Sequence, residues 1–376
     1  MNWVKGKFDG KKTLYTQEGD RADSPWKIEQ VNFINSALAN RVDVSQAATL
    51  AHNRRPKLCF TGQNPANTGF TMDVADAARM LRANAHNKDV VVPYLIGDDI
   101  VSSGEPSRWI VDFGTRSLFD ARSYKEPFAW VEERVMGDVI ARAAEEKVAT
   151  GKQSTRWTRM ARWWQFRDAM PGTMAAIAKI SRYVAIPRVT KRPIFEFVRS
   201  IIHPDSAVVV FAFADDYSYG VVQSSLHCDW FKARCSTLEG RFRYTSDTVF
   251  NTFPWPQGPT CEQIKAVAEA AVTLRALRRE TMRKLNYSLR DLYRTLKQPG
   301  DNPLRDAHAR LDAAVRAAYG MPEDSDPFAL LLELNVACAA KEKAGKKITP
   351  PGLPLPPDEH ARLITDDCIQ PPILKG

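Results

Sequence analysis

Hydrophobic positions follow two different periods along the chain, and the change falls near residue 256. Before it, short apolar runs of strand length occupy residues 90–96, 108–113, 183–189, 194–198 and 207–213. The last run is almost continuous, as expected of a strand buried on both faces. Helical spacing interrupts these runs at residues 128–146 and 173–180. The mixture predicts an α+β domain with a central sheet.

After residue 256 the apolar positions recur three and four residues apart. Thr260 and Gln263 have the spacing of a capping box, and Asn302-Pro303 has the form of a helix cap followed by a first-turn proline. A last helix is predicted over residues 327–344. The second half is therefore predicted to be an α-helical domain.

The two ends of the chain carry weaker patterns. Residues 1–55 hold hairpin-like strands, with a tight-turn signal at Asp9-Gly10 and too few apolar positions for a core. The proline pairs of residues 346–376 are typical of an extended linker. The predicted organisation is a strand remnant at 1–55, a mixed domain at 56–258, a helical domain at 259–345 and a Pro-rich tail at 346–376.

Positive charge is concentrated in one part of the chain. Residues 148–200 contain eleven Lys or Arg and two acidic residues, an excess equal to the net charge of +9 of all 376 residues. Trp157, Trp163 and Trp164 lie among these charges. Guanidinium groups and aromatic rings on a strand-rich frame indicate a protein that binds and reads nucleic acid.

Other protein classes find little support in the sequence. No apolar run approaches the length that spans a bilayer, and the N-terminus lacks a secretory core, so a cytoplasmic protein without membrane contact is expected. The six cysteines are scattered without a C-x-x-C pair, which favours reduced thiols over disulfides or a metal site.

Catalytic motifs were sought as an alternative to binding. Glu145 and Lys147, with Asp138 seven residues before Glu145, fit part of a metal-dependent nuclease site, although helical spacing favours a solvated face. His227, Cys228 and Asp229 form a nucleophile-like cluster on a predicted helix, where a structural histidine is favoured. A non-catalytic assembly subunit of a phage-defence complex is the third alternative, in which the basic helices bind protein.

Several segments, taken in order, resemble one known family. They are YVAIPRVTK at 183–191, QSSLH at 223–227, RYTSDTVFNTFPWP at 243–256 and WWQF at 163–166. These resemble the target-recognition domain of MmeI-like, type IIL restriction–modification DNA methyltransferases, and the helical part resembles the domain that follows it. The resemblance covers residues 2 to about 344.

The resemblance implies sequence-specific recognition of double-stranded DNA for an adenine-N6 methyltransferase. It implies S-adenosylmethionine as cofactor of the intact enzyme, but this chain has no Gly-rich loop and no Asn-Pro-Pro-aromatic loop; Asn64-Pro65-Ala66-Asn67 departs from it at the last two positions. We therefore expect no catalytic, cofactor or metal site here. A separate methyltransferase or nuclease chain remains open as a partner.

The expected DNA-binding residues combine the basic stretch with the segments that carry the resemblance. They are Lys152, Arg156, Arg159, Arg162, Trp163, Trp164, Gln165, Arg188, Thr190, Lys191, Arg192, Ser224, Ser225, Arg243, Tyr244 and Thr245. Arg and Gln can form paired hydrogen bonds with base edges, and Trp can stack on bases. Among these residues, Arg192 is predicted to read one base pair.

Overall fold

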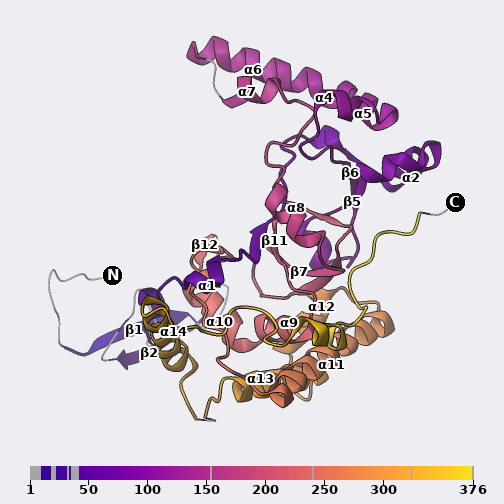
Figure 1. Cartoon of the computed structure of the whole chain (residues 1–376). Helices are drawn as coiled ribbons and strands as arrows, with labels where there is room; N and C mark the ends of the chain where they lie inside the picture. The colour runs from indigo at the N-terminus through magenta and orange to yellow at the C-terminus, as the bar shows by residue number, and fades with distance from the viewer. Residues whose placement is uncertain are drawn as a thin grey trace.

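The computed structural model describes residues 10–17, 23–31, 34, 42–152, 155–238, 241–322 and 324–374. Figure 1 shows an upper lobe, a central sheet and a layer of helices below it. Strands and helices mix before residue 256 and helices dominate after it, which confirms the predicted α+β class with a helical C-terminal region. None of the helices in these described segments is long and apolar enough to cross a membrane.

The central sheet carries the core of the molecule. Its antiparallel strands run in the order β3 (Cys59–Thr61), β11 (Val208–Phe211), β7 (Arg182–Pro187) and β9 (Glu196–Arg199). Successive side chains of a strand point to opposite faces. In β7, Val184 and Ile186 join the core shared with the helical layer, whereas Tyr183 and Ala185 join a second core on the other face. The apolar runs therefore mark strands buried on both sides, as predicted.

The upper lobe has a sheet and a core of its own. Its strand order is β10 (His203–Pro204), β5 (Val91–Leu95), β6 (Arg108–Val111) and β4 (Thr71–Met72). The surrounding helices are α2 (Val74–Ala83), α4 (Leu118–Arg122), α5 (Lys125–Val131), α6 (Gly137–Thr150) and α7 (Thr155–Met160). Helices α3 (Gly97–Val101) and α8 (Pro171–Ile177) instead pack on the second face of the central sheet through Ile100 and Ile177. A π-helical turn at Glu132–Met136 joins α5 to α6.

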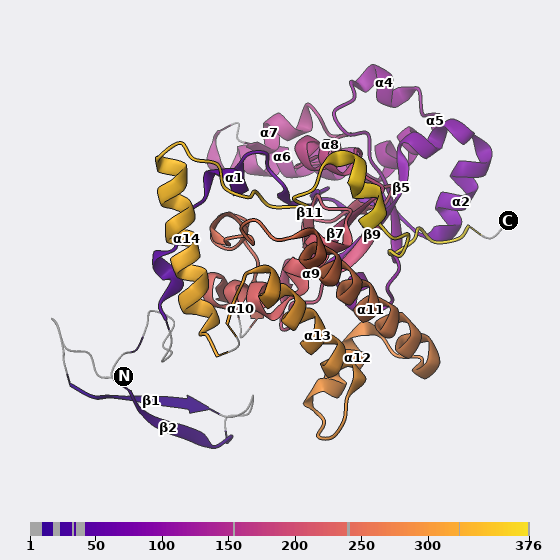
Figure 2. The same ribbon diagram turned by 60° about the horizontal axis from the view of Figure 1, so that its bottom comes forward.

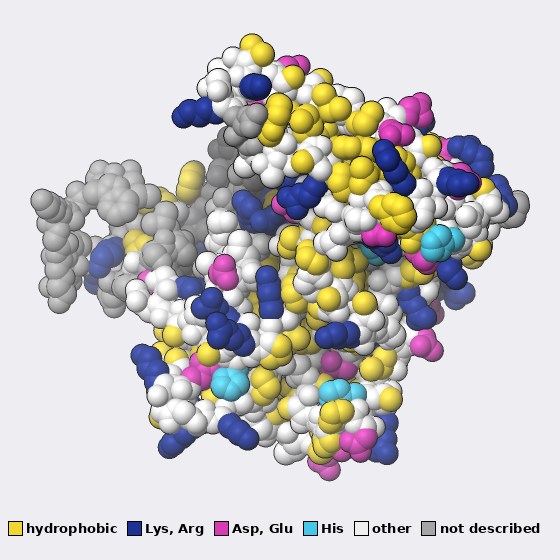
Figure 3. Space-filling view, turned by 45° about the horizontal axis from the view of Figure 1, so that its top comes forward, with side chains coloured by type: hydrophobic (Ala, Val, Ile, Leu, Met, Phe, Trp, Pro, Cys, Tyr) yellow, Lys and Arg dark blue, Asp and Glu magenta, His cyan; other side chains and the backbone are white. Residues whose placement is uncertain are grey.

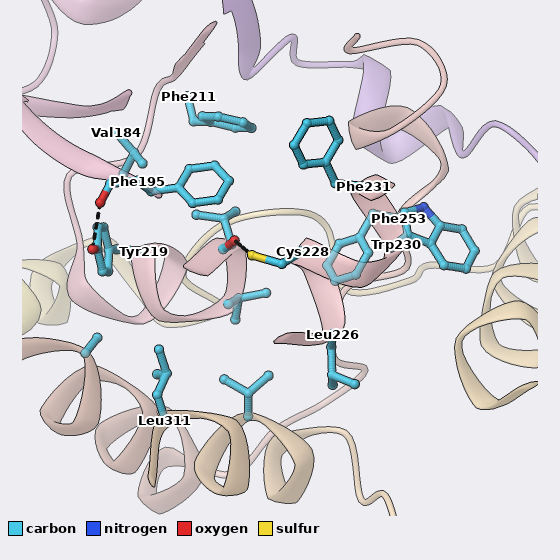
Figure 4. Close-up of a cluster of buried hydrophobic side chains, with 14 of the residues drawn as sticks. Val184, Phe195, Phe211, Tyr219, Leu226, Cys228, Trp230, Phe231, Phe253 and Leu311 are labelled. Carbon is cyan, nitrogen blue, oxygen red and sulfur yellow. Dashed lines mark hydrogen bonds between the residues drawn. The ribbon is translucent and has the colours of Figure 1, made fainter. Parts of the chain in front are cut away.

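The helical layer packs directly on the mixed domain. It contains α11 (Cys261–Leu285), α12 (Leu289–Arg294), α13 (Pro303–Ala318) and α14 (Pro327–Lys343), with α9 (Asp216–Gln223) and α10 (Ser225–Arg234) between it and the sheet (Figure 2). A Cβ on Gly220 of α9 would lie 2.7 Å from Cγ1 of Val267 in α11. This close approach requires glycine, and it makes sheet, α9 and α11 parts of one core (Figure 4).

A buried network of charged side chains crosses this core. The carboxylate of Asp216 accepts hydrogen bonds from Arg182 at 2.7 Å and from Arg275 at 2.5 Å, and these residues are 1–2% exposed. Both arginines also contact Asp367 of the C-terminal segment. Arg278 forms a second buried pair with Glu196 at 2.9 Å. Strand β7, helices α9 and α11 and the tail are thus joined at one point.

The two ends of the chain differ in how they contact the body. The tail, predicted as an extended linker, lies along the molecule: Ile369 pairs with Val198 of β9, and Thr349 exchanges hydrogen bonds with Gln257. Strands β1 (Lys12–Gln17) and β2 (Trp26–Val31) form a hairpin that projects from the body in Figure 2. The expected strand before Asp9-Gly10 lies outside the described residues.

Replacing Asp216 with alanine is expected to lower the free energy of unfolding by about 3–5 kcal/mol, because two buried arginines lose their shared partner. Chemical denaturation would measure the loss. The matched control is Asp229→Ala, which removes the exposed Asp229–Lys232 pair and should cost at most about 1 kcal/mol. Equal losses in the two variants would contradict a special role for the buried network.

Candidate nucleic-acid interface

A small sheet of the mixed domain carries exposed basic residues. It consists of β12 (Ser236–Leu238), β13 (Arg241–Arg243) and β8 (Val189–Thr190), paired antiparallel in this order. Phe242 packs on Phe231 of α10, with ring centroids 6.2 Å apart, so Arg241 and Arg243 point to the opposite, exposed face. The sheet is an extension of the β7 end, which gives these arginines a rigid base.

Two guanidinium groups lie close together on this sheet. The pKa of Arg188 is lowered by its partial burial and by the positive charge of Arg243. Tyr244 N donates to the carbonyl of Arg188 at 2.9 Å, which fixes the two strands relative to each other. No acidic side chain pairs with either arginine within the described ranges. Like charges without a counter-charge among the described residues have the electrostatics that suit contact with an anion.

The second basic element is the helix pair α6 and α7 at the edge of the upper lobe. Lys152 and Arg162 are exposed, and Arg156 lies 3.9 Å from Glu146. Arg159 is half-buried and donates from Nη2 to the carbonyl of Pro65 at 2.9 Å. Its pKa is lowered by burial and by the nearby charges of Arg167 and Arg142. In Figure 3, Lys and Arg side chains gather left of the centre and recur along the upper lobe.

A cavity of about 320 Å³ lies beside α6, between the 64–68 loop and the residues around β5, β6 and β10. Its walls include Asn64, Asn67, Arg108, Arg142 of α6 and Asp205. Asp205 Oδ1 accepts from Ala207 N at 2.7 Å, and the Ala207 carbonyl accepts from Arg188 N at 2.7 Å. One wall of this cavity is therefore linked through Ala207 to Arg188, the residue that precedes β8.

The sequence prediction missed several basic residues of this face. Arg241, Arg142 and Arg108 were absent from the expected set. Arg241 lies two residues before Arg243 in a strand, so the two-residue period of strands was a signal that could have identified it. Arg108 and Arg142 carry no such signal, because only the tertiary fold brings them together.

Trp163 and Trp164 of the basic stretch lie in the core, whereas Trp157 is only partly buried. Trp163 and Trp164 are 9% and 8% exposed, and Trp163 packs on Phe128 with centroids 5.5 Å apart. Trp164 Nε1 and Gln165 Nε2 both donate to the carbonyl of Arg116, at 3.0 and 2.9 Å. Because these side chains anchor a loop of the upper lobe, the structure does not support the base stacking and base contacts predicted for the three residues.

Three further expected DNA-binding residues hold α10 in place. Ser224 is fully buried and caps α10, and Ser225 N donates to Asp312 Oδ1 at 2.7 Å. Tyr244 is 1% exposed, and its hydroxyl lies 3.0 Å from Nε2 of His227. The side chains of Ser224 and Tyr244 are buried and hydrogen-bonded within the protein, so this structure does not support their predicted contact with DNA.

In the turn after β7, two of the residues predicted to bind DNA form contacts within the protein. Thr190 Oγ1 donates to Arg192 O at 2.6 Å and accepts from Arg192 N at 3.1 Å, so this hydroxyl shapes the turn. The Arg192 guanidinium donates to the carbonyl of Tyr293 in α12. Arg192 therefore joins the turn to the helical layer, and this geometry does not support its predicted role in reading a base. Lys191 is exposed, and Thr245 contacts Thr248 at 2.5 Å.

Two of the residues considered for a nuclease site, Asp138 and Lys147, are engaged in structural contacts. Asp138 accepts from Asn67 at 2.7 Å and from Arg142 at 2.9 Å, and Lys147 lies over the Trp157 ring at 5.1 Å. Within the described ranges, no three His, Cys, Asp or Glu side chains are arranged to hold a metal ion. The nuclease alternative gains no support from this arrangement.

The chain matches one protein family and is similar to two known proteins. The profile of the family "MmeI, target recognition domain" matches residues 39–257, more than half of the chain. The chain thus belongs to the MmeI-type target-recognition family, which confirms the resemblance found in the sequence. It is 28% identical over 178 residues to DNA methyltransferase A of Bacillus subtilis (strain 168), covering 46% of this chain and 19% of that protein.

The fold is shared with a solved structure of the type IIL restriction–modification enzyme MmeI in complex with DNA. The TM-score is 0.65 at 22% identity, over 89% of this chain and 42% of the MmeI chain. This chain therefore spans less than half of either relative.

The family implies S-adenosylmethionine as the methyl donor. The segment of this chain that is most similar to the Asn-Pro-Pro-aromatic loop is Asn64–Asn67, and it does not fit that donor. In Asn64–Asn67, Asn64 Oδ1 accepts from Ala66 N at 2.9 Å, and Asn67 bonds Gly69 N and Asp138, both at 2.7 Å. Both amides are therefore occupied in holding the loop, and no aromatic residue follows them. We assign neither S-adenosylmethionine nor a methyl-transfer step to these residues.

The buried His227 predicts a pH dependence of stability. Burial lowers its pKa from 6.5 to about 4, although the hydrogen bond to the Val222 carbonyl opposes the shift. The folded state therefore binds this proton less readily than the unfolded state, and stability is lost as pH falls below 6.5. We expect a loss of about 2 kcal/mol from this residue between pH 7 and pH 5.

Urea denaturation of the wild type and of His227→Gln at both pH values would isolate this contribution. The wild type should lose about 2 kcal/mol more than the variant on acidification. His308, whose pKa burial lowers to about 3, acts in the same direction and is unchanged in both proteins. An identical loss in the two proteins would contradict the assignment to His227.

Proposed function

We propose that this chain recognises a DNA sequence for an adenine-specific methyltransferase of a restriction–modification system. The observation that carries the proposal is the pair of exposed basic elements, α6–α7 and the β8–β13 sheet, on a target-recognition fold. Separate elements suit the two tasks of such a protein, because phosphate contacts position it and base contacts specify the sequence. The rival assembly role would need a protein partner for the same basic surface.

Base reading is assigned to Arg188 and Arg243 in this proposal. Both extend from a sheet that is anchored in the core through Phe242 and Tyr244, so little side-chain freedom is lost on binding. Arginine can donate two hydrogen bonds to guanine in the major groove. The positive charges of Arg188 and Arg243 have no acidic partner among the described residues, which also favours contact with DNA.

We expect Arg243→Ala to relax sequence preference at one position of the recognised site. The loss on the preferred base should be about 1–3 kcal/mol, roughly 5- to 150-fold in affinity, and much smaller on the other bases. Binding to a library of single-base variants measures this. The matched control is Arg192→Ala, whose guanidinium is bound to Tyr293, and it should leave the order of preference unchanged. A uniform loss across the library for Arg243→Ala would assign that residue to a phosphate.

The helix pair α6–α7 is expected to bind the phosphate backbone. If about six cations of residues 148–200 touch phosphates, the logarithm of affinity should fall with the logarithm of salt at a slope near −5, since each contributes about −0.9. Replacing Lys152, Arg156 and Arg159 together with alanine should weaken all sequences alike and flatten the slope by up to about three. An unchanged slope would place the backbone contacts elsewhere, such as the helices after Thr260.

We further propose that the projecting hairpin contacts the catalytic methyltransferase unit, in the same polypeptide or in a separate one. The register pairs Tyr15 with Ile28 and Gln17 with Trp26, which puts three large apolar side chains on one face. They are 57–61% exposed. A two-stranded hairpin is marginally stable alone, so this face is suited to a protein partner that covers it. S-adenosylmethionine would be bound by that unit.

The partner proposal is tested with the methyltransferase unit of the same restriction–modification system. The purified chain alone is expected to transfer no labelled methyl groups to DNA, and addition of the unit should establish transfer. The double variant Tyr15→Ser, Ile28→Thr should lose association in analytical ultracentrifugation, because apolar contact area is removed. Thr16→Ser, on the opposite face, is the control. Association that survives the double variant would move the contact away from the hairpin.

A further inference from the structure

The cavity of about 320 Å³ beside α6 has two arginines on its walls. Arg108 is the first residue of β6, and Arg142 lies in α6. The other walls include residues 64–68, Tyr94 and Asp205. All of these residues except Tyr94 are at least partly exposed. The cavity is therefore a surface feature that a ligand can reach.

The carboxylates at this cavity are engaged in hydrogen bonds within the protein. Among the described residues, Asp205 supplies the carboxylate of the lining; its Oδ2 accepts from the Tyr94 hydroxyl at 2.8 Å and its Oδ1 from Ala207 N at 2.7 Å. Asp138 lies next to the lining and accepts from Asn67 Nδ2 at 2.7 Å and from Arg142 Nε at 2.9 Å. Every oxygen of these two carboxylates thus has a donor from this chain.

The two arginines, in contrast, have donors to spare. Burial and the charge of Asp205 raise the pKa of Tyr94, and the positive charge of Arg108 opposes that shift, so the Arg108 guanidinium lies near the Tyr94 hydroxyl. Within the described part of the chain, Arg108 has no hydrogen-bond or ion-pair partner, and Arg142 uses only its Nε. A guanidinium has five N–H donors, so most donors of this pair are available to a ligand.

Helix α7 and the segment after it add charge beside the cavity. Arg159 Nη2 donates to the Pro65 carbonyl at 2.9 Å and so fixes one wall. The pKa of Arg159 is lowered by burial and by the charges of Arg167 and Arg142, which places the three guanidinium groups near one another. Arg167 is itself paired with Asp168 at 3.1 Å. In this group, four arginines face three carboxylates, an excess of one positive charge: Arg108, Arg142, Arg159 and Arg167 against Asp138, Asp168 and Asp205.

We propose that this cavity holds one phosphate group of the DNA backbone, an inference that rests on the proposed function. Arg108 and Arg142 donate to the non-bridging oxygens, because the planar guanidinium matches the geometry of a phosphate. The excess of one positive charge equals the single negative charge of a phosphodiester. The carbonyl of Ala207, whose N–H holds Asp205, accepts from Arg188 N at 2.7 Å. A phosphate held here therefore sets the position of the duplex relative to Arg188.

The contact is tested by measuring DNA affinity against salt concentration for the full chain, with a duplex selected from a random library by the wild type. The double variant Arg108→Gln, Arg142→Gln should bind about tenfold more weakly, and the slope of log affinity on log salt should flatten by about 0.9. The order of sequence preference should stay unchanged, because a phosphate contact carries no base information. The matched control is Arg79→Gln in α2, whose arginine pairs with Asp76 outside the cavity.

Two outcomes of this experiment have different meanings. An unchanged slope in the double variant, with sequence-selective binding by the wild type, would overturn the phosphate contact and leave the proposed function standing. Absence of sequence-selective binding by the wild type would overturn both. The variants Arg108→Lys and Arg142→Lys, which keep the charge but lose the fork, should retain the wild-type slope at reduced affinity. This comparison separates loss of a phosphate contact from a general loss of folding.

Neutral methylphosphonates in the DNA locate the phosphate. Duplexes with one substitution at each successive backbone position are bound to the wild type and to the double variant. At one position the wild type should lose about tenfold, and the double variant should lose nothing more, because the contact is already absent. Equal losses in both proteins at every position would contradict the assignment. Inorganic phosphate is titrated into the free chain in parallel; its binding at these arginines without any such position in the DNA would make free phosphate the ligand and overturn the proposal.

Discussion

The structure depends on the buried carboxylate of Asp216 and the two arginines that share it. Arg182 begins β7, the strand that continues into the arginine-bearing sheet, and Arg275 lies in the middle of α11. Charged groups are costly to bury, and they are tolerated here because each finds several hydrogen-bond partners, including Asp367. The contact fixes the position of β7 relative to the helical layer. The residues that follow the other end of this strand are therefore positioned by the same contact.

That position determines which basic residues can face a ligand. β7 ends at Pro187, and the next residue, Arg188, pairs through its carbonyl with the strand that carries Arg243. Arg192, only four residues further, is turned back to the helical layer by Tyr293. Arg188 and Arg192 thus differ in their surroundings, because the carbonyl of Tyr293 is bound by the Arg192 guanidinium only.

The upper lobe has a core of its own and is joined to the central sheet by short connections. β10 pairs with β5 in the lobe, while the residues after it lead directly into β11 of the central sheet. Two cavities lie along this junction, one of about 320 Å³ lined by Asp205 and one of about 470 Å³ lined by His203. Polar side chains are present there because backbone N–H and C=O groups at the ends of the strands have no partner strand and form hydrogen bonds with side chains instead.

The sequence by itself determined the class of the fold, the helical second half and the family, because these rest on periodicity, caps and ordered motifs. The capping box at Thr260 and the strand at 207–213 appear in the structure almost as predicted. The sequence also located the basic stretch, because the net charge of a segment follows directly from its numbers of Lys, Arg, Asp and Glu.

Only the tertiary structure decided which members of that stretch are exposed. Trp163, Trp164, Tyr244 and Ser224 have the same residue types as DNA-contacting groups, but packing places them in the core. Arg182 was counted among the cations of the basic stretch and is instead neutralised by a carboxylate 34 residues away. Burial and long-range pairing depend on which segments the fold brings together, and a linear pattern contains no record of that.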